Sequence, residues 1–208
     1  MPAEKGKRKW RIGVIGCGAW GPNHVRNFAA LPNVEVVGAA DLREDKLARV
    51  ASLVPGIATF TSAARLMEEV RPDAVVVSTP TRTHFEVVKE ALLAGKHVLC
   101  EKPLCSTVDE AEALVQMAAA KGLLLMVGHV FLFNRGILKL RELIKGGELG
   151  RIYYLFARRT NLGPIRADVN AVLDLASHDV SIYNHLLGGP PLEVSAVGQS
   201  FLQPGSRT

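Results

Sequence analysis

The chain has 208 residues, of which 48% are hydrophobic and 22% charged. This composition is typical of a globular protein with a sizeable core, and it excludes a disordered or fibrous chain. The net charge of +5 is concentrated in a short basic tail, residues 1–10, and the remaining body is nearly neutral. Such a distribution argues against a nucleic-acid partner, because nucleic-acid binding needs a basic surface on the folded body.

The cysteines and the apolar runs indicate the compartment. Cys17, Cys100 and Cys105 show no CxxC spacing, which fits a reducing compartment and no structural zinc. Glycines interrupt the stretch after the basic tail, so no signal peptide is recognised. The longest fully apolar run, Leu123–Val127, is far too short to cross a bilayer. We therefore expect a cytoplasmic protein with no metal and no membrane partner.

Short apolar runs alternate with helical patterns from residue 11 to about residue 146. The runs are nearly continuous, so both faces of each strand should be buried, as in a parallel sheet with helices on both sides. Thr107 or Asp109 is expected to cap a helix, and Gly95 and Gly122 follow two helix ends. The expected strands are Ile12–Ile15, Val34–Ala40, Ile57–Phe60, Ala74–Ser78, His97–Cys100 and Leu123–Val127, and the expected helices are 22–31, 43–53, 62–70, 84–94 and 107–121. This order predicts a doubly wound α/β domain over residues 11–128.

The pattern changes after Gly150. Residues 151–159 and 192–200 are expected to form strands, and residues 171–187 a helix. Two strands and a helix are too few for an independent sheet domain, since about three strands are the minimum. Residues 129–208 therefore either pack on the first domain or form part of a sheet that needs further strands.

The run Gly16–Gly21 has the form GxGxxG, directly after a predicted strand and at the start of a predicted helix. In dinucleotide-binding folds such glycines permit a tight turn, a close backbone approach to pyrophosphate and close packing of the helix on the sheet. The N–H groups at the helix start would then hold the phosphates. The alternative is a glycine-rich turn with a capping aspartate. The spacing favours a dinucleotide site.

Asp41 ends the second predicted strand, 20 residues after Gly21. A carboxylate there accepts both hydroxyls of the adenosine ribose and repels a 2′-phosphate, so NAD is predicted rather than NADP. Arg43 either stacks on adenine or offsets part of that repulsion.

Two polar clusters follow the fourth and fifth predicted strands. Residues 78–84 (STPTRTH) lie where ligands bind in open α/β sheets, or alternatively form a turn in which His84 caps a helix. Lys102 stands between Glu101 and Pro103 at the next strand end. A partly desolvated ammonium there can hold a substrate hydroxyl, and the alternative is a solvated surface lysine.

Asp174 and His178 are separated by one helical turn and share a helix face. A carboxylate beside an imidazole raises its basicity and fixes its orientation, as a general base needs. The alternative is a surface pair without a catalytic role.

These clusters, in this order, resemble the Gfo/Idh/MocA (glucose–fructose oxidoreductase/inositol dehydrogenase) family over residues 10 to about 200. The resemblance rests on the RIGVIGCGAWG opening, Asp41, the STPTRTH turn, the EKP motif at Lys102, the stretch Gly128–Asn134 and the Asp174…His178 pair. It implies a two-domain oxidoreductase. A Rossmann domain with a doubly wound parallel sheet would be followed, over residues 129–208, by the beginning of an α+β domain with a mostly antiparallel sheet.

The resemblance also implies roles for single residues. Lys102 would orient and polarise the reacting hydroxyl of a sugar, polyol or nucleotide-sugar, His178 would be the acid/base, and Asp174 its partner or a substrate ligand. Cofactor contacts are expected from Gly16, Gly18, Ala19, Trp20, Gly21, Asp41, Leu42, Arg43, Thr79, Pro80, Thr81, His84, Glu101 and Lys102. Substrate contacts are expected from Lys102, His129, Asn161, Asp174 and His178.

Residues 158–166, rich in arginine and other donors, look similar to substrate loops that bind phosphates or carboxylates, or are solvated arginines at a strand end. Family members usually continue past the length of this chain and complete the second sheet, which commonly forms the subunit interface, so a homo-oligomer is expected where that sheet is complete. Two other functions stay open. One is a non-catalytic NAD-binding regulator or incomplete subunit. The other is glycoside cleavage with transient use of NAD.

Overall fold

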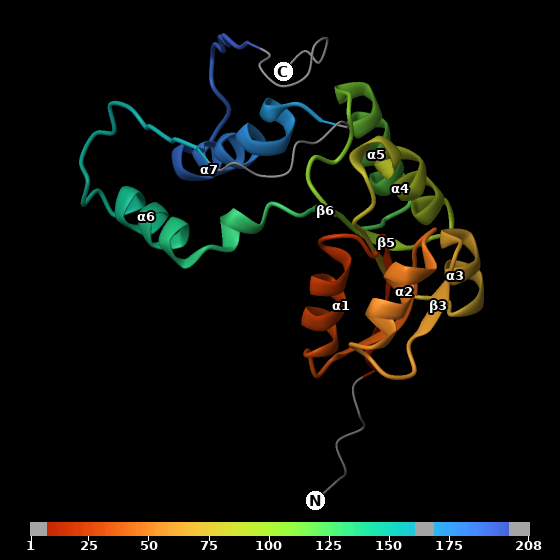
Figure 1. The fold of residues 1–208 in the computed structure, drawn as a ribbon. Coiled ribbons are helices and arrows are strands. Elements are labelled where there is room, and N and C mark those ends of the chain that lie inside the picture. Colours follow the sequence, from red (N-terminus) through yellow and green to blue (C-terminus); the bar gives the residue numbers. More distant parts are fainter. Residues whose placement is uncertain (1–7, 161–168, 200–208) are drawn as a thin grey trace, which may run out of the picture. The chain divides into compact units, whose positions relative to one another are not determined.

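A computed structural model of the protein describes residues 8–160 and 169–199. The chain divides into two compact units, Met1–Gly128 and His129–Thr208. Figure 1 shows the ribbon coloured along the sequence, with the first unit from red to green and the second from green to blue. No helix within the described ranges is long and apolar enough to cross a membrane.

The first unit contains a six-stranded sheet in which all neighbouring strands are parallel, in the order β3-β2-β1-β4-β5-β6. The strands are β1 (Trp10–Ile15), β2 (Val34–Ala40), β3 (Ala58–Phe60), β4 (Ala74–Val77), β5 (His97–Cys100) and β6 (Leu125–Val127). The helices are α1 (Gly21–Ala29), α2 (Glu44–Ala51), α3 (Ala63–Glu69), the short 3-10 helix η1 (Thr81–Thr83), α4 (His84–Leu93) and α5 (Val108–Ala120). This strand order is that of doubly wound dinucleotide-binding folds. The predicted α/β fold is confirmed.

Two apolar cores explain the uninterrupted hydrophobic runs in the strands. On one face of the sheet, Val25 of α1 and Leu47 of α2 pack with strand residues such as Val14. On the other face, Leu66 of α3, Leu92 of α4 and Leu114 of α5 pack with strand residues such as Val75 and Val77. Each central strand is therefore buried on both sides, and burial of an aliphatic side chain contributes about 1.5–3 kcal/mol.

The ends of α5 follow from its sequence. Thr107, rather than Asp109, is the N-cap, because its side chain accepts the Glu110 N–H while the Glu110 side chain accepts the Thr107 N–H. Beyond the last turn, Gly122 adopts a φ of 64°, a left-handed conformation that side chains disfavour.

The order of the strands positions the candidate site. After β3 the chain crosses back to place β4 beside β1, so the connections from β1 and from β4 leave the sheet in opposite directions. Ligands of such sheets bind in the crevice at this switch point, outside the carboxyl ends of the strands. Gly16, Ser78, Asp41 and Glu101 directly follow β1, β4, β2 and β5.

In the second unit the described residues are helical or irregular. The elements are η2 (Val130–Phe133), α6 (Arg135–Lys145), the π-helical turn η3 (Val172–Ala176) and α7 (Ser177–Leu187). The expected helix over residues 171–187 is confirmed, with a π-helical first part. Helix α6 was missed by the sequence analysis, although Asn134 caps it by accepting the Gly136 and Ile137 N–H groups.

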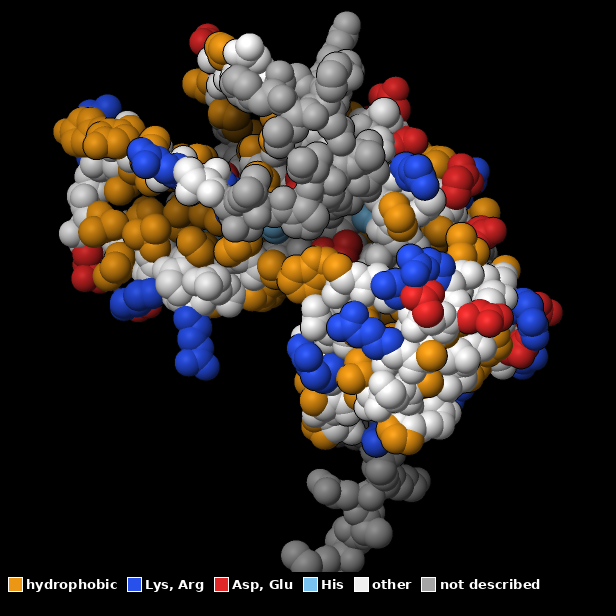
Figure 2. All heavy atoms as spheres, in the orientation of Figure 1, with side chains coloured by type: hydrophobic (Ala, Val, Ile, Leu, Met, Phe, Trp, Pro, Cys, Tyr) orange, Lys and Arg blue, Asp and Glu red, His pale blue; other side chains and the backbone are white. Residues whose placement is uncertain are grey.

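The two strands expected in the second unit are wrong for the residues described. Residues 151–159 and 192–199 are not in strands, and residue 200 lies outside the described ranges. A strand forms only against a neighbour that accepts its hydrogen bonds. Most of the hydrophobic side chains on these segments are exposed instead, and Figure 2 shows hydrophobic side chains gathered on the surface of the second unit. The exposed residues are Tyr153, Tyr154, Phe156, Leu192, Val194 and Val197. The predicted antiparallel sheet is therefore not found among the described residues.

Candidate active site

Two glycines of the loop between β1 and α1 are required by the protein itself. Gly16 has a φ of 94°, and a Cβ there would come within 2.6 Å of the Ser78 carbonyl carbon and the Thr79 nitrogen. A Cβ on Gly21 would lie 2.1 Å from the Gly16 oxygen. Any side chain at either position would force the loop away from the sheet, because these contacts are with backbone atoms.

Gly18 differs, because a Cβ built there would meet no atom within 4 Å. No packing of the described chain explains this glycine, and open space next to the backbone suits a pyrophosphate that approaches closely. The helix behind it also fits, because α1 starts without a side-chain cap and the positive end of its dipole favours an anion. Pro22 in the first turn has no N–H, and the Asn23 and His24 N–H groups donate to the Trp20 carbonyl. Ala19 and Trp20 of the same loop are exposed.

Asp41 is oriented by backbone donors. Its Oδ2 accepts the Cys17 N–H at 2.7 Å, and its Oδ1 accepts the Arg43 N–H at 2.9 Å. The carboxylate at the end of β2 is thus fixed against the glycine loop. Each carboxylate oxygen keeps a further acceptor position for a ribose hydroxyl. Leu42, beside it, is exposed.

The Arg43 guanidinium is paired with a second carboxylate, that of Asp45. Its Nε and Nη2 donate to the two oxygens of Asp45 at 3.0 and 2.8 Å. This hydrogen bonding raises the pKa of Arg43 and lowers the pKa of Asp45 from their ordinary values. The guanidinium charge is therefore matched by Asp45.

The segment after β4 is tied to the glycine loop and to the segment after β5. The Ser78 hydroxyl donates to the Gly16 carbonyl at 2.7 Å. His84 is fully buried, and its two ring nitrogens lie 2.9 Å from the carbonyl oxygens of Thr79 and Pro103. The His84 ring therefore offers no atom to a ligand and bridges two loops instead. Of the remaining predicted contacts here, Thr81 is buried and Pro80 exposed.

Lys102 is half-buried between two buried residues, Glu101 and Pro103. Glu101 Oε1 lies 2.8 Å from His24 Nε2 of α1, and Glu101 Oε2 accepts the Lys102 N–H at 3.3 Å. His24 was missed by the sequence analysis. The sequence signal for His24 was its position one helical turn before Phe28, which places both residues on the same face of the helix. In the structure the two rings stack on each other.

In the second unit, His178 lies at the start of α7 and Asp174 in the π-helical turn before it. The His178 ring meets the Phe131 ring edge to face, with centroids 4.8 Å apart. The Arg159 guanidinium lies 4.9 Å from the Phe131 centroid and donates to Asp179 at 2.8 Å. Arg159 therefore packs on Phe131, the ring that contacts His178, and Asp179 matches the charge of Arg159.

The other predicted residues of this unit are placed as follows. His129 is half-buried and directly precedes η2. Asn161 lies outside the described residues, as does most of the arginine-rich segment 158–166. Arg158 stacks over Phe156, 5.9 Å from its ring centroid. Within the described ranges, no group of three His, Cys, Asp or Glu side chains is arranged to hold a metal ion.

Comparison with known families matches both parts of the chain. Residues 10–129 match the model "Oxidoreductase family, NAD-binding Rossmann fold". Residues 137–207 match the model of the GFO/IDH/MocA C-terminal domain. The first match alone covers more than half of the 208 residues and contains the whole glycine loop, Asp41 and Lys102.

Individual proteins give the same result. The chain is 37% identical over 189 residues to a UDP-N-acetylglucosamine 3-dehydrogenase of Acidithiobacillus ferrooxidans, covering 90% of this chain and 58% of that protein. It is 30% identical over 193 residues to a myo-inositol 2-dehydrogenase of Thermotoga maritima, with the same two coverages. Among solved structures, the WlbA dehydrogenase of Bordetella pertussis in complex with NADH and UDP-GlcNAcA is 27% identical, with a TM-score of 0.76 over 87% of this chain and 60% of that one. The chain thus spans less than two thirds of the length of these proteins. These matches agree with the glycine loop and the sheet order described above. They show that the chain belongs to the Gfo/Idh/MocA family of oxidoreductases with an NAD-binding Rossmann fold.

Proposed function

We propose that the protein is an NAD-dependent dehydrogenase that transfers hydride between a hydroxyl-bearing carbon of a sugar, polyol or nucleotide-sugar and nicotinamide. The observation that carries the proposal is the glycine loop. Gly18 has open space next to its backbone, and Asp41 is fixed against the same loop by the Cys17 N–H. The names of the relatives, a UDP-N-acetylglucosamine 3-dehydrogenase and a myo-inositol 2-dehydrogenase, support this substrate class.

The residues of the first unit fit a dinucleotide. The positive end of α1 and the backbone of Gly18 would hold the pyrophosphate, and Asp41 would bind the adenosine ribose hydroxyls. Trp20 and Leu42, both exposed, flank these positions in sequence. Thr79 and Pro80 follow β4 at the switch point, where the nicotinamide half would lie.

NAD is proposed rather than NADP on electrostatic grounds. The Asp41 carboxylate would repel a ribose 2′-phosphate. Arg43 is the nearest cation in sequence, and its guanidinium is engaged by both oxygens of Asp45. An arginine paired in this way offers little charge to a phosphate.

NAD supplies the hydride acceptor, and the protein supplies position and proton transfer. Lys102 is proposed to hold and polarise the reacting hydroxyl. His178 is proposed to take its proton, with Asp174 as the partner of His178 or as a substrate ligand. A positioned acid/base group contributes about 10²–10⁴ in rate.

The first experiment is a titration of the protein with NADH and, separately, NADPH. Binding is followed by nicotinamide fluorescence and by quenching of Trp20, one of the two tryptophans. The other, Trp10, starts β1 at the far end from the glycine loop, so a Trp20→Phe variant isolates the local signal. Tight NADH and weak NADPH binding are expected.

Turnover on a panel of polyols, sugars and nucleotide-sugars then tests the roles. Lys102→Ala and His178→Ala should each lower kcat by about 10²–10⁴ with NADH affinity unchanged. The control is Lys96→Ala, at a half-buried lysine at the opposite end of β5, and it should keep full activity.

Three outcomes would contradict this proposal. Loss of NADH affinity in Lys102→Ala and His178→Ala with turnover intact contradicts the assigned roles. NADH binding without turnover on any substrate favours a non-catalytic NAD-binding protein. Turnover of glycosides without net NADH release favours cleavage with transient oxidation.

A further inference from the structure

A nearly buried hydrogen bond joins the cofactor helix to the segment that carries Lys102. His24 Nε2 and Glu101 Oε1 are 2.8 Å apart, although the two residues are separated by 77 positions in the sequence. Only 15% of the His24 side chain and 11% of the Glu101 side chain are exposed. An ionised carboxylate only accepts hydrogen bonds, so His24 Nε2 is the donor.

The Glu101 carboxylate contacts more than His24. Its second oxygen accepts the N–H of Lys102. It also lies against Gly128, where an added Cβ would come within 3.3 Å of Oε2. A carboxylate with so little exposure is costly unless it is well paired, because it loses its hydration. His24 from α1 and the Lys102 N–H provide that pairing.

A second histidine holds the other side of Lys102. His84, the first residue of α4, is fully buried, with Nδ1 2.9 Å from the Pro103 carbonyl oxygen and Nε2 2.9 Å from the Thr79 carbonyl oxygen. Carbonyl oxygens only accept hydrogen bonds, so the His84 tautomer with its proton on Nδ1 donates to Pro103. In that tautomer the backbone on both sides of Lys102 is anchored to imidazole rings that come from two different helices. We call His24, Glu101 and His84 the histidine clamp.

The clamp fixes backbone, whereas the Lys102 side chain is half-buried. A lysine has four rotatable side-chain bonds, so its ammonium is placed accurately only if its Cα is held still. A misplacement of about 1 Å at a reacting centre costs about 10²-fold in rate. Fixing the Lys102 backbone is therefore worth as much as a catalytic contact.

We propose that His24 and Glu101, together with His84, are positioning residues that fix the Lys102 backbone relative to the cofactor helix α1 during hydride transfer. This inference rests on the proposed function. None of the three is proposed to touch the reacting atoms. The clamp also explains why a nearly buried Glu and a fully buried His stand next to the catalytic lysine.

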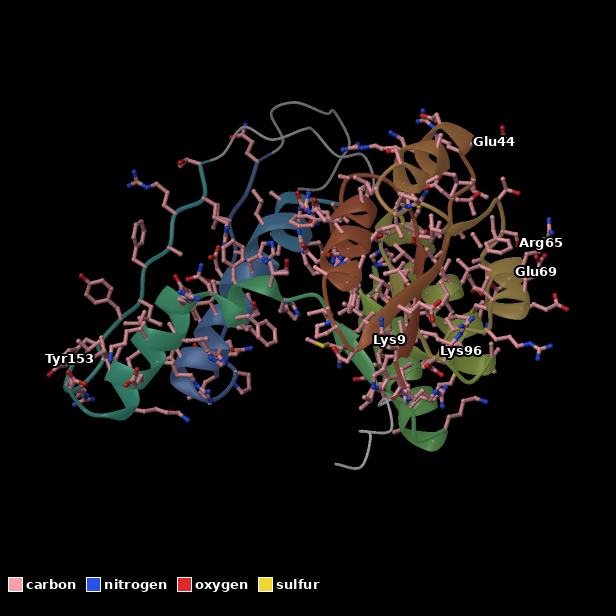
Figure 3. All side chains as sticks on the ribbon, turned by 90° about the horizontal axis from the view of Figure 1, so that it is seen from below. Lys9, Glu44, Arg65, Glu69, Lys96 and Tyr153 are labelled. Carbon is pink, nitrogen blue, oxygen red and sulfur yellow. The ribbon has the colours of Figure 1, made fainter. Side chains whose placement is uncertain are left out.

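The test compares His24→Leu, which removes the donor to Glu101, with His24→Gln, which keeps an N–H donor. Glu101→Gln keeps an acceptor for the Lys102 N–H and removes the charge. The matched control is Glu69→Gln, which breaks an exposed pair with Arg65 on α3; Figure 3 labels both residues. Three quantities are measured on the full chain: hydrogen exchange of the Lys102 amide by NMR, the Kd for NADH, and kcat and KM on the substrate found in the panel.

In His24→Leu, the Lys102 amide is expected to exchange about tenfold faster, because its acceptor is no longer anchored. Its kcat should fall about 10²-fold with the Kd for NADH and KM unchanged. His24→Gln should restore most of kcat, and the His24→Leu/Glu101→Gln double variant should be no slower than the slower single variant, because the two residues act as one unit. Glu69→Gln should change nothing.

Three results overturn the inference. Unchanged Lys102 exchange in His24→Leu would show that the pair does not hold this backbone. Faster exchange with kcat unchanged would show that the clamp only stabilises the fold. An equal loss of NADH affinity and kcat would place the pair in cofactor binding. If the unaltered protein binds no NADH, the proposed function is wrong, and the inference about the histidine clamp is wrong as well. The NADH titration distinguishes this result from the other three.

Discussion

The two units bury their hydrophobic residues to different extents. In the first unit the strands pair with one another, and helices on both faces bury residues such as Val14 and Val77 completely. In the described part of the second unit, Ile182 and Leu186 of α7 are the buried hydrophobic residues. Tyr153, Phe156, Leu192 and Val197, which sequence patterning assigns to strands, remain exposed.

This difference shows where function can be tested independently. The glycine loop, Asp41, the histidine clamp and Lys102 all belong to the first unit, whose core is formed by its own residues. The proposed proton acceptor, His178, belongs to the unit with little core of its own among the described residues. On the proposed function, we therefore expect cofactor binding to depend on one well-packed unit and turnover to depend on both.

Hydrogen exchange should show the largest contrast between the units. Amides of β1 and β4 lie in paired central strands, whereas residues 152–156 and 192–197 have no strand partners among the described residues. We expect exchange in these two segments to be faster by on the order of 10³-fold or more, because opening β1 requires most of the global free energy of unfolding. Mass spectrometry of peptic fragments measures this directly. Slow exchange at residues 152–156 would show that they pair in solution, for example with a second copy of the chain. The expected difference in amide exchange between the two units would then be wrong.

Two glycine variants separate the stability of the first unit from its cofactor site. In Gly21→Ala, the new Cβ would overlap the Gly16 oxygen at 2.1 Å. We expect a loss of about 3 kcal/mol, the upper end for overpacking, and a thermal midpoint lower by about 10 °C. In Gly18→Ala, where the Cβ meets no atom within 4 Å, the midpoint should stay unchanged while NADH affinity falls about tenfold.

Thermal melts with and without NADH measure both effects. Gly189→Ala in the second unit, also with open space around its Cβ, is the control and should change neither quantity. If Gly18→Ala retains full NADH affinity, the pyrophosphate does not approach this backbone.

A smaller effect is expected for cofactor choice. In Asp45→Ala the Arg43 guanidinium loses both of its acceptors and becomes available to a ribose 2′-phosphate. We expect the ratio of NADPH to NADH affinity to rise about threefold, a modest change because the pair is exposed and screened by solvent. The control is Glu44→Ala, at the adjacent acidic residue labelled in Figure 3, which removes the same charge and leaves the Arg43–Asp45 pair in place. An equal rise in both variants would mean that general charge, and not the Arg43–Asp45 pair, sets the preference.

The sequence predicts the cofactor half well because its features are local. Six apolar runs, the GxGxxG spacing and Asp41 at a strand end each depend on neighbours close in the chain. The His24–Glu101 pair could not be predicted in this way, since it forms only after β1, β4 and β5 have brought residues 77 positions apart together. The strands expected at 151–159 and 192–200 are not found among the described residues, for a related reason. Alternating or apolar patterns describe a surface that fits a sheet, but the hydrogen-bonding partner is not encoded in the strand itself.

The smallest expected effect concerns the thiols. All three cysteines, Cys17, Cys100 and Cys105, are free, buried and in the first unit. Burial, and secondarily the charge of Asp41, raises the pKa of Cys17 to about 12. Burial, and then Glu110, raises the pKa of Cys105 to about 11. A thiol with a raised pKa stays protonated at pH 8, and the thiolate is the reactive form, so alkylation should be slower than for a free thiol by on the order of 10²–10³-fold.

Iodoacetamide labelling, read by mass spectrometry, tests this protection at pH 8. Little labelling is expected in the folded protein, all three sites should label in denaturant, and NADH affinity should survive treatment of the folded protein. Because the second unit contains no cysteine, thiol protection reports on the first unit alone. Protected thiols together with fast amide exchange at residues 152–156 would show that the cofactor unit stays closed while those segments of the second unit remain open. Rapid labelling of Cys17 would instead show that the glycine loop opens readily, and the first unit would lose the rigidity on which the placement of Lys102 depends.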